Sequence, residues 1–480
     1  MKHSLFSAAG RCGCPIIFFV AAMTLLWITT SRAEEPTATA GKSEVAQRRG
    51  DPQWPDHPGS FKAAIAAQPV YRLLGAKDLG RSDNDMREKM PAVNVGMLDG
   101  ALAWRPRDGG HTDGPNIKHF IRCAASSDKD ERSLKEAVGD RFKLGVGVGH
   151  ALLQNPEDAK LIVQHFSILT PENCMKPQSI HPAENGWNFD ASDRFVEFAR
   201  SNNLEVVGHC LVWAKDDRTD PWMISDGDQP VSRETLLKRI EDHIDTVVQR
   251  YRETVTMWDV VNEAIGDSEE GLLRDSVYSR TTGIDFIVTA FKAARAGDAD
   301  ALLIYNDYNG HKPGKREKLI ELLTKLKDAG APVDAYGMQG HFELGDESID
   351  QLRETFDQLR KLGIKVVVSE LDIDVVKRGR WWADGGKHRE ELATFDPYKK
   401  GMPEEIARQQ AEQYVALFKL FDEYSDIIER VSFWNLHDGE SWLNYFPWRR
   451  VNHPLLFDRD RQPKPAFDAV YQTLTAKEKS

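Results

Sequence analysis

Two glutamates follow apolar, β-rich runs, and together they have the chemistry to cleave a glycosidic bond. Glu263 ends the run VTMWDVVNE and Glu370 ends the run IKVVVSE. Cleavage needs a proton for the leaving oxygen and stabilisation of an oxocarbenium-like centre, which two carboxyl groups in different protonation states can share. A single glutamate after a strand is as often a solvated loop carboxylate. Whether the two glutamates form a catalytic pair therefore depends on the structural elements that position them.

Eight short β-rich runs provide those elements, and amphipathic stretches such as SRETLLKRIEDHIDTVVQRYR lie between most of them. The runs span residues 143–149, 165–173, 205–213, 255–263, 301–309, 335–342, 364–373 and 431–438. Strand and helix alternate over about 345 residues, which is within the size range of a parallel barrel. The sequence therefore predicts an α/β fold, a (β/α)₈ TIM barrel.

A doubly wound parallel sheet is the main alternative, and the positions of the polar residues argue against it. Nearly every run begins apolar and ends polar, and in a barrel all these ends converge on one face. A doubly wound sheet usually carries a Gly-rich phosphate turn, whereas VGVGHALLQ lacks the final glycine, so we predict no nucleotide site. The polar run ends are Glu172, Asn173, His209, Trp213, Asn262, Glu263, Asn306, Asp307, Gln339, His341, Glu370, Asp372 and Trp434.

Aromatic residues near the run ends favour a sugar ligand. Trp213, Trp434 and Trp442 lie at or just past predicted strand ends, where a flat ring can stack on a pyranose and its N–H can bind a hydroxyl. Packing in the core is the alternative for each of them. Trp381 and Trp382, in the long seventh loop, either extend the cleft or anchor the loop.

Other polar residues near the same ends are candidate ligand contacts. His209 and His341 each stand at the end of a run beside polar groups, which favours ligand contact or tuning of a glutamate over a core role. We expect His341 to hydrogen-bond Glu370. Lys176 and Asn173, in TPENCMKP, offer donors to sugar hydroxyls, although a role in starting a helix stays open.

The first 33 residues have the pattern of a secretory signal peptide. Lys2 and Arg11 charge its start, residues 15–28 form an apolar core, and Ser31-Arg32-Ala33 offers small residues for cleavage. The apolar core is shorter than the roughly 20 residues that span a bilayer, so export with cleavage is favoured over an anchor. The sequence therefore predicts secretion, extracellular or periplasmic, without stable membrane insertion.

The charge balance argues against a polyanionic partner. The chain has 63 basic and 75 acidic residues, and its net charge of −12 becomes more acidic still once the signal is removed. Because basic runs are missing as well, we predict no nucleic-acid partner. We also expect a monomer.

The remaining chain divides into an extension and a barrel region. Residues 34–130 are rich in breakers such as DPQWPDHPGS, so we interpret them as a linker or extension of unknown role, with a small sugar-binding module left open. Residues 131–476 form the predicted catalytic domain.

Three cysteines remain after the signal: Cys123, Cys174 and Cys210. Because their number is odd and their spacing does not suit a metal site, we expect buried free thiols rather than a disulfide or a zinc site.

Seven of the motifs, in order over about residues 131–476, resemble family 10 of the glycoside hydrolases, the endo-β-1,4-xylanases. They are LTPENCMKP, GHCLVW, WDVVNEA, YNDYN, GMQGHF, VVVSELDI and FWNLHDGESW. The resemblance implies that Glu263 is the acid/base and Glu370 the nucleophile, with no cofactor and no metal.

Four residues would support catalysis in such an enzyme. Asn262 would hold the sugar 2-hydroxyl, His341 and Asp372 would support the nucleophile, and Gln339 would complete that network. The resemblance implies that the glycone-side sugar contacts are Glu172, Asn173, Lys176, His209, Trp213, Trp434 and Trp442.

The chain departs from the family pattern at two places. After GHCLVW the family usually has histidine and, two positions later, glutamine, whereas this chain has Ala214, Lys215 and Asp216. We expect this change to weaken or reshape a glycone subsite without removing the glutamate pair. In the last loop, Asn435 and His437 stand where the family tends to have smaller residues.

The resulting hypothesis is a retaining endo-β-1,4-xylanase acting on xylan or xylo-oligosaccharides. Two alternatives remain open from the sequence: a retaining glycosidase for another β-linked glycan, and a non-catalytic glycan-binding protein whose altered Ala214 region marks lost activity.

Overall fold

A computed structural model describes residues 132–346, 348–382 and 386–476 of the chain. They belong to a compact unit that begins at Arg132. The predicted signal peptide (1–33), the extension (34–130) and Cys123 lie outside the described residues.

Eight parallel strands form a closed barrel. Neighbouring strands pair in chain order, and the last strand pairs both with the seventh and with the first, which closes the sheet on itself. This closure confirms the TIM barrel and rules out the doubly wound alternative. The strands are β1 (Lys143–Val148), β2 (Ile168–Pro171), β3 (Glu205–Trp213), β6 (Val255–Asn262), β7 (Leu302–Asp307), β8 (Ala335–Met338), β10 (Lys365–Asp374) and β11 (Ile428–Trp434).

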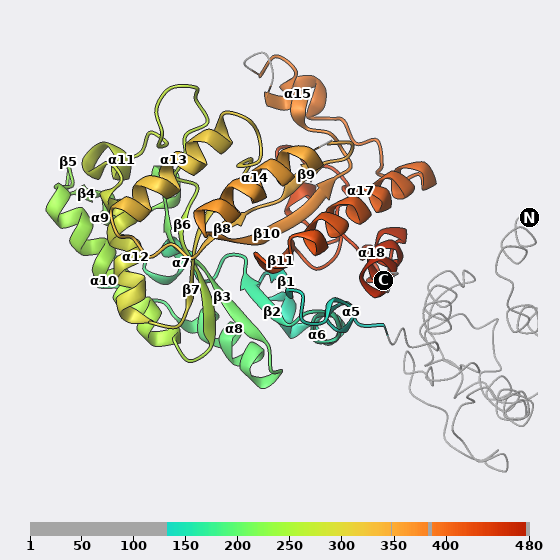
Figure 1. The fold of residues 1–480 in the computed structure, drawn as a ribbon, viewed down its shortest axis with the longest axis horizontal. Helices are drawn as coiled ribbons and strands as arrows, with labels where there is room; N and C mark the ends of the chain where they lie inside the picture. Colours follow the sequence, from blue (N-terminus) through green and yellow to red (C-terminus); the bar gives the residue numbers. More distant parts are fainter. Residues whose placement is uncertain (1–131, 347, 383–385, 477–480) are drawn as a thin grey trace, which may run out of the picture. The chain divides into compact units, whose positions relative to one another are not determined.

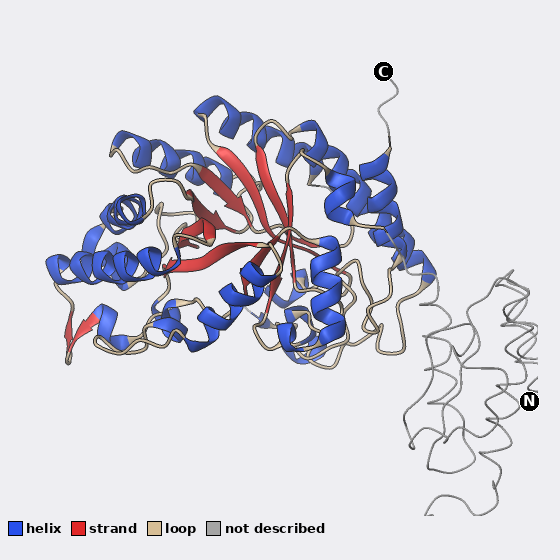
Figure 2. Cartoon of the chain, turned by 90° about the horizontal axis from the view of Figure 1, so that it is seen from below, coloured by secondary structure: helices blue, strands red, loops and turns tan. Residues whose placement is uncertain are grey.

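A helix follows each barrel strand and covers the outside of the sheet (Figures 1 and 2). These helices are α6 (Pro156–His165), α8 (Asp190–Ser201), α10 (Arg233–Tyr251), α12 (Asp285–Gly297), α13 (Lys315–Asp328), α14 (Ile349–Leu362), α17 (Glu404–Glu423) and α18 (Pro465–Thr475). Shorter elements include α5 (Leu134–Val138), α7 (Pro177–Ile180), α9 (Pro221–Ile224), α11 (Val277–Thr282), α15 (Gly379–Trp382), α16 (Arg389–Leu392), the 3₁₀ turns Leu152–Gln154, Asp216–Arg218 and Trp442–Asn444, and the short strands β4 (Ser225–Asp226), β5 (Gln229–Pro230) and β9 (His341–Glu343).

Local sequence signals set the helix ends. Asn155 caps α6 by accepting from the backbone N–H groups of Glu157 and Asp158, and Pro156 starts the first turn. Helix α14 ends at Gly363, whose φ of 73° is the left-handed conformation that closes many helices.

The apolar core has two layers, one inside the barrel and one between the strands and the helices. The outer layer is large and includes the buried faces of α10, α12, α14 and α17. The inner layer is a small separate cluster with one side chain from each of six consecutive strands, which fills the barrel below the strand ends. It consists of Ile168, Val207, Met257, Ile304, Ala335 and Val367.

Glu370 and His209 were predicted to end their strands, but each lies inside its strand. Glu370 lies inside β10, which continues to Asp374 because the short strand β9 pairs with it beyond the barrel. His209 likewise lies in the middle of β3, which runs on to Trp213. The side chains of both residues still reach the face of the barrel at the carboxyl ends of the strands, since the pairing register shifts beside each of them.

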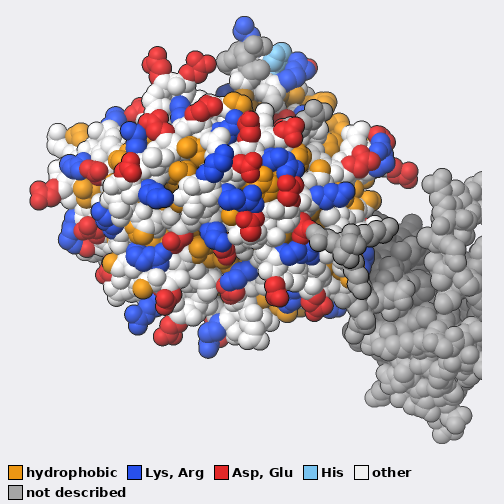
Figure 3. Space-filling model, viewed as in Figure 1, with side chains coloured by type: hydrophobic (Ala, Val, Ile, Leu, Met, Phe, Trp, Pro, Cys, Tyr) orange, Lys and Arg blue, Asp and Glu red, His pale blue; other side chains and the backbone are white. Residues whose placement is uncertain are grey.

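Acidic and basic side chains are interspersed over the face of the barrel unit shown in Figure 3. In the part of the chain that the structure describes, no helix is both long and apolar enough to cross a bilayer.

Candidate active site

A pocket of about 1830 Å³ opens at the carboxyl ends of the barrel strands. Most of the predicted site residues line it: Glu172, Lys176, His209, Trp213, Asn262, Glu263, Gln339, His341, Glu370, Trp434 and Trp442. Two predicted residues do not line the pocket. Asp372 is fully buried beneath His341, and Asn173 is exposed beside Lys176, whose Nζ donates to its Oδ1 at 3.0 Å.

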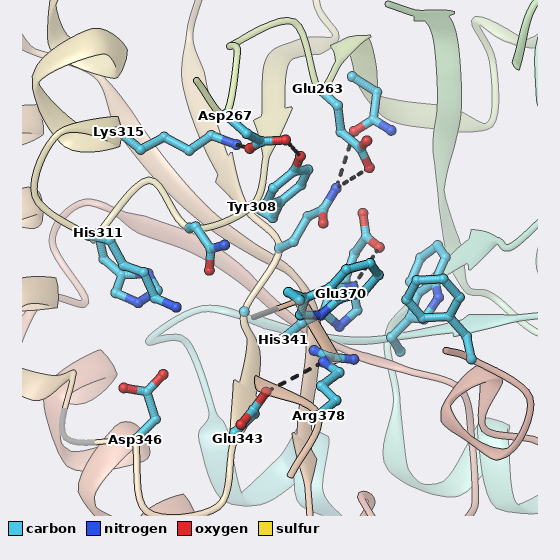
Figure 4. A pocket seen from close by; sticks show the side chains of 18 of the residues that line it. Glu263, Asp267, Tyr308, His311, Lys315, His341, Glu343, Asp346, Glu370 and Arg378 are labelled. Carbon is cyan, nitrogen blue, oxygen red and sulfur yellow. Dashed lines mark hydrogen bonds and ion pairs between the residues drawn. The ribbon is translucent and has the colours of Figure 1, made fainter. Parts of the chain in front are cut away.

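Glu370 has a partner on each carboxylate oxygen. The Asn306 side-chain amide donates to Oε1 at 2.8 Å, and His341 Nε2 lies 3.2 Å from Oε2. The carboxylate is buried, and it points into the same pocket as Glu263 (Figure 4). Two fixed donors hold such a carboxylate in one orientation.

Glu263 follows β6 directly and has a different environment. Its φ of 57° is rare for a residue with a side chain, and its N–H donates to the Asn306 carbonyl at 2.8 Å. Gln339 Nε2 donates to Oε1 at 3.1 Å, and Lys215 Nζ lies 3.1 Å from Oε2. Burial raises the pKa of Glu263, but Lys215 and Gln339 outweigh it and hold the pKa below its usual range.

A chain of amide groups connects the two glutamates. Asn306 donates to Asn262 Oδ1 at 2.9 Å as well as to Glu370, and Gln339 donates to Glu263 with a longer contact of 3.5 Å to Asn262. These residues come from β6, β7, β10 and the end of β8. The barrel strands therefore fix the geometry of the pair. Asn306 was predicted only as a polar strand end, and its linking position was missed.

His341 lies between two carboxylates. Its Nδ1 is 3.0 Å from Asp372 Oδ2, which also accepts from Trp442 Nε1 at 2.8 Å. Burial lowers the pKa of His341, but Asp372 and then Glu370 outweigh that effect and raise the pKa to about 9. The predicted support of Glu370 by His341 and Asp372 agrees with this geometry.

We expect the His341 imidazole to stay charged at pH 7 and to lose its proton near pH 9. Because the folded pKa lies above the ordinary 6.5, the charged ring stabilises the fold below pH 6.5, and this contribution is lost as the pH rises through about 9. An NMR titration of the ring protons would measure the midpoint, with His341→Gln assigning the signal. Asp372→Asn should lower it. A midpoint at or below 6.5 in the unsubstituted protein would contradict the assignment.

Six of the seven glycone-side residues predicted from the resemblance line one wall of the pocket, whereas Asn173 lies outside the lining. Lys176 Nζ lies 4.9 Å from the centre of the Trp213 ring, and the His209 ring meets Trp434 edge-on at 5.4 Å. His209 Nδ1 is 2.8 Å from Asp259 Oδ2, which orients its ring. Burial raises the pKa of Glu172 on the same wall, although Lys176 opposes this.

Trp434 needs a glycine opposite it. A Cβ at Gly147, its partner in β1, would lie 2.5 Å from the Trp434 ring. The ring therefore packs directly over the backbone of β1.

The opposite wall carries a charged cluster that the sequence analysis missed. Tyr308 donates to Asp267 at 2.5 Å, Lys315 lies 3.3 Å from the same carboxylate and 3.5 Å from the Tyr308 ring centre, and Arg274 contacts both (Figure 4). Tyr308 belongs to the YNDYN motif, which was the available signal. The other three residues come from loops and a helix start.

The two tryptophans of the seventh loop have different positions. Trp381 stacks on Trp448 with ring centres 5.2 Å apart, which anchors the loop. Trp382 lines the pocket, is 53% exposed and packs near Phe446. Trp381 thus fits the predicted role as a loop anchor, and Trp382 fits the predicted extension of the cleft.

The departures in the last loop hold that loop in place. Asn435 Oδ1 accepts from the Trp442 backbone N–H at 3.0 Å, and His437 Nε2 lies 3.3 Å from Asp158.

The predicted free thiols are also present: Cys174 and Cys210 are buried and unpaired. Within the described ranges, no group of three or more His, Cys, Asp or Glu side chains is placed to hold a metal.

A closed parallel barrel with two buried glutamates on one amide network at its carboxyl face is the architecture of a glycoside hydrolase. The sequence model of glycosyl hydrolase family 10 matches residues 133–473. The chain belongs to this family.

Several relatives share the barrel region. The endo-1,4-beta-xylanase B of Paenibacillus barcinonensis is 39% identical over 337 residues, which cover 70% of this chain and 96% of the relative. An endo-1,4-beta-xylanase of Geobacillus stearothermophilus is 38% identical with the same coverage. A Paenibacillus barcinonensis xylanase crystallised with a conduramine derivative has a TM-score of 0.66 at 37% identity, covering 72% of this chain and 99% of its own. A mutant solved in complex with xylotriose has a TM-score of 0.65 at 35% identity and covers 71% and 99%.

Proposed function

We propose that this protein is a retaining endo-1,4-β-xylanase in which Glu263 is the acid/base and Glu370 the nucleophile. The observation that carries the proposal is the pair of buried glutamates joined by one amide network at the carboxyl face of the barrel. Each carboxylate oxygen has one partner: Asn306 and His341 hold Glu370, and Gln339 and Lys215 hold Glu263. The xylanase relatives and the xylotriose complex support xylan as the substrate class.

The reaction proceeds in two displacements. Glu370 attacks the anomeric carbon and forms a glycosyl ester, while the leaving oxygen takes a proton from Glu263 as the glycosidic bond breaks. Glu263 then removes a proton from water, which attacks the same carbon and releases Glu370 as a carboxylate. Asn262, held by Asn306, lies beside both glutamates, where it can bind the 2-hydroxyl group.

Two fixed tryptophans support the choice of xylose over glucose. Trp442 is tied through its N–H to Asp372, and Trp434 is buried against His209 and Gly147. A xylosyl unit has no exocyclic hydroxymethyl group, so these rigid rings would exclude a glucan while leaving room for xylan.

We also propose that the protein is exported and acts as a monomer without a nucleic-acid partner. The signal-like first 33 residues support export, and the acidic balance of the chain argues against a nucleic-acid partner. Detection of the mature protein outside the cytoplasm of its host, beginning after Ala33, would test export, and sedimentation would test the oligomeric state.

Product analysis tests the catalytic proposal. Purified protein should release short oligosaccharides from xylan, and NMR of the first product should show the β-anomer. An inverted first product would remove Glu370 as nucleophile. Cleavage of cellulose or mannan without cleavage of xylan would assign the barrel to another β-linked glycan, and binding without any cleavage would make it a non-catalytic glycan-binding protein.

A further inference from the structure

A lysine that the family pattern does not predict contacts the proposed acid/base. Lys215 Nζ lies 3.1 Å from Glu263 Oε2, and both side chains are largely buried, with exposures of 28% and 10%. The lysine belongs to the Ala214–Asp216 stretch, where the sequence departs from the family. A contact between a cation and a general acid affects the chemical step directly, because it stabilises the form of the acid that has already lost its proton.

The backbone around Lys215 is fixed on both sides. The Ala214 N–H donates to the Asn262 carbonyl at 3.0 Å, and Thr219 Oγ1 donates to the Lys215 carbonyl at 2.9 Å. Asp216 is turned away from the pocket, where it accepts from the Val277 N–H at 2.8 Å at the start of α11. The lysine side chain is therefore directed into the pocket by its loop.

Other charged groups near Glu263 act more weakly or with the opposite sign. Arg274 donates from Nε to the backbone carbonyl of Glu263 at 3.1 Å, so it does not pair with the carboxylate. Among the residues that the structure describes, Lys215 is the cation in ion-pair contact with this carboxylate. The titratable or charged groups around it are Lys215 after β3, His209 and Asp259 on β3 and β6, Arg274 and Asp267 after β6, Tyr305 and Asp307 on β7, His341 on β9, and Glu370 and Asp372 on β10.

We propose that Lys215 is a positioning residue for Glu263, holding its carboxylate ionised and turned toward the ammonium group before substrate binds. The proposal rests on the function proposed above. The first displacement needs protonated Glu263, so Lys215 restricts it to more acidic pH, whereas the second displacement uses the ionised form that Lys215 favours. A residue outside the glutamate pair thus sets the alkaline limit of the working pH.

The matched variants Lys215→Met and Lys215→Arg test this proposal. Methionine keeps the length of the side chain without its charge, and arginine keeps the charge. We expect Lys215→Met to move the alkaline limb of kcat/KM on xylo-oligosaccharides to higher pH, so that the ratio of variant to parent rises by about threefold or more along that limb. Lys215→Arg should keep the parental profile.

A second substrate separates the effect on Glu263 from a loss of binding. A dinitrophenyl β-xylobioside needs little acid assistance, so the alkaline limb of its kcat/KM should move little between parent and Lys215→Met. Thermal unfolding of both variants checks that they fold.

Three outcomes are distinguishable. An unchanged alkaline limb in a folded Lys215→Met, or a limb that moves equally on both substrates, would overturn the role of Lys215. A parent protein that cleaves no xylan would instead overturn the proposed function. A shift in Lys215→Arg equal to that in Lys215→Met would also overturn the proposal, because charge would then be irrelevant.

Discussion

Replacing Glu370 with glutamine is expected to lower turnover of xylan by about five orders of magnitude, the scale seen when a covalent enzyme loses its nucleophile. The amide cannot form the glycosyl ester, while it still accepts from Asn306 and so keeps its place in the network. Binding of xylo-oligosaccharides should therefore survive. The measurements are initial rates of reducing-end release and the affinity for xylotriose by calorimetry.

Glu343→Gln is the matched control for that variant. Glu343 lines the same pocket but lies near Arg378 rather than on the amide network, at 3.8 Å from its Nε. We expect its rate to stay within about tenfold of the parent, as for a charge that touches no reacting atom. Parental turnover by Glu370→Gln would remove Glu370 as nucleophile.

Replacing Glu263 with alanine is expected to cost about 10² to 10⁴ in kcat/KM on xylan, the usual contribution of a general acid. The loss should depend on the leaving group, because a dinitrophenyl xylobioside needs little protonation and should still form the glycosyl enzyme rapidly. That intermediate should then accumulate, since its hydrolysis lacks a base.

Azide separates this account from general damage to the site. A small anion can enter the space left by the carboxylate and attack the intermediate without base assistance, which should restore turnover and give a β-xylosyl azide. An equal loss on both substrates, with no rescue by azide, would assign the acid/base role elsewhere.

The barrel and most of its carboxyl-face residues were predictable from the sequence because parallel strands buried on both faces read as short continuous apolar runs. Glu263 illustrates this, since it directly follows the last residue of β6. The end of β10 was predicted to within one residue, since the run 364–373 continues past Glu370. Its pairing with the short strand β9 beyond the barrel leaves no mark in that run.

Long-range contacts explain what else was missed. Asn306 lies 64 positions from Glu370, and Gln339 lies 76 positions from Glu263, so no local pattern joins them. The direction of Lys215 is set by the hydrogen bonds of its loop, notably that between Thr219 and the Lys215 carbonyl. Sequence comparison marked that stretch as unusual, but only the structure shows which group it faces.

The amide network has a practical consequence for protein engineering. The side chains that connect Glu263 to Glu370 come from the strands or the residues directly after them, whereas Lys215, Asp267 and Trp382 come from connecting loops. Loop exchange could therefore adjust pH optimum or polymer preference independently of the spacing between the two carboxylates. The barrel strands fix the distance between the two carboxylates, which the chemistry requires. The loops around them can change without altering that distance.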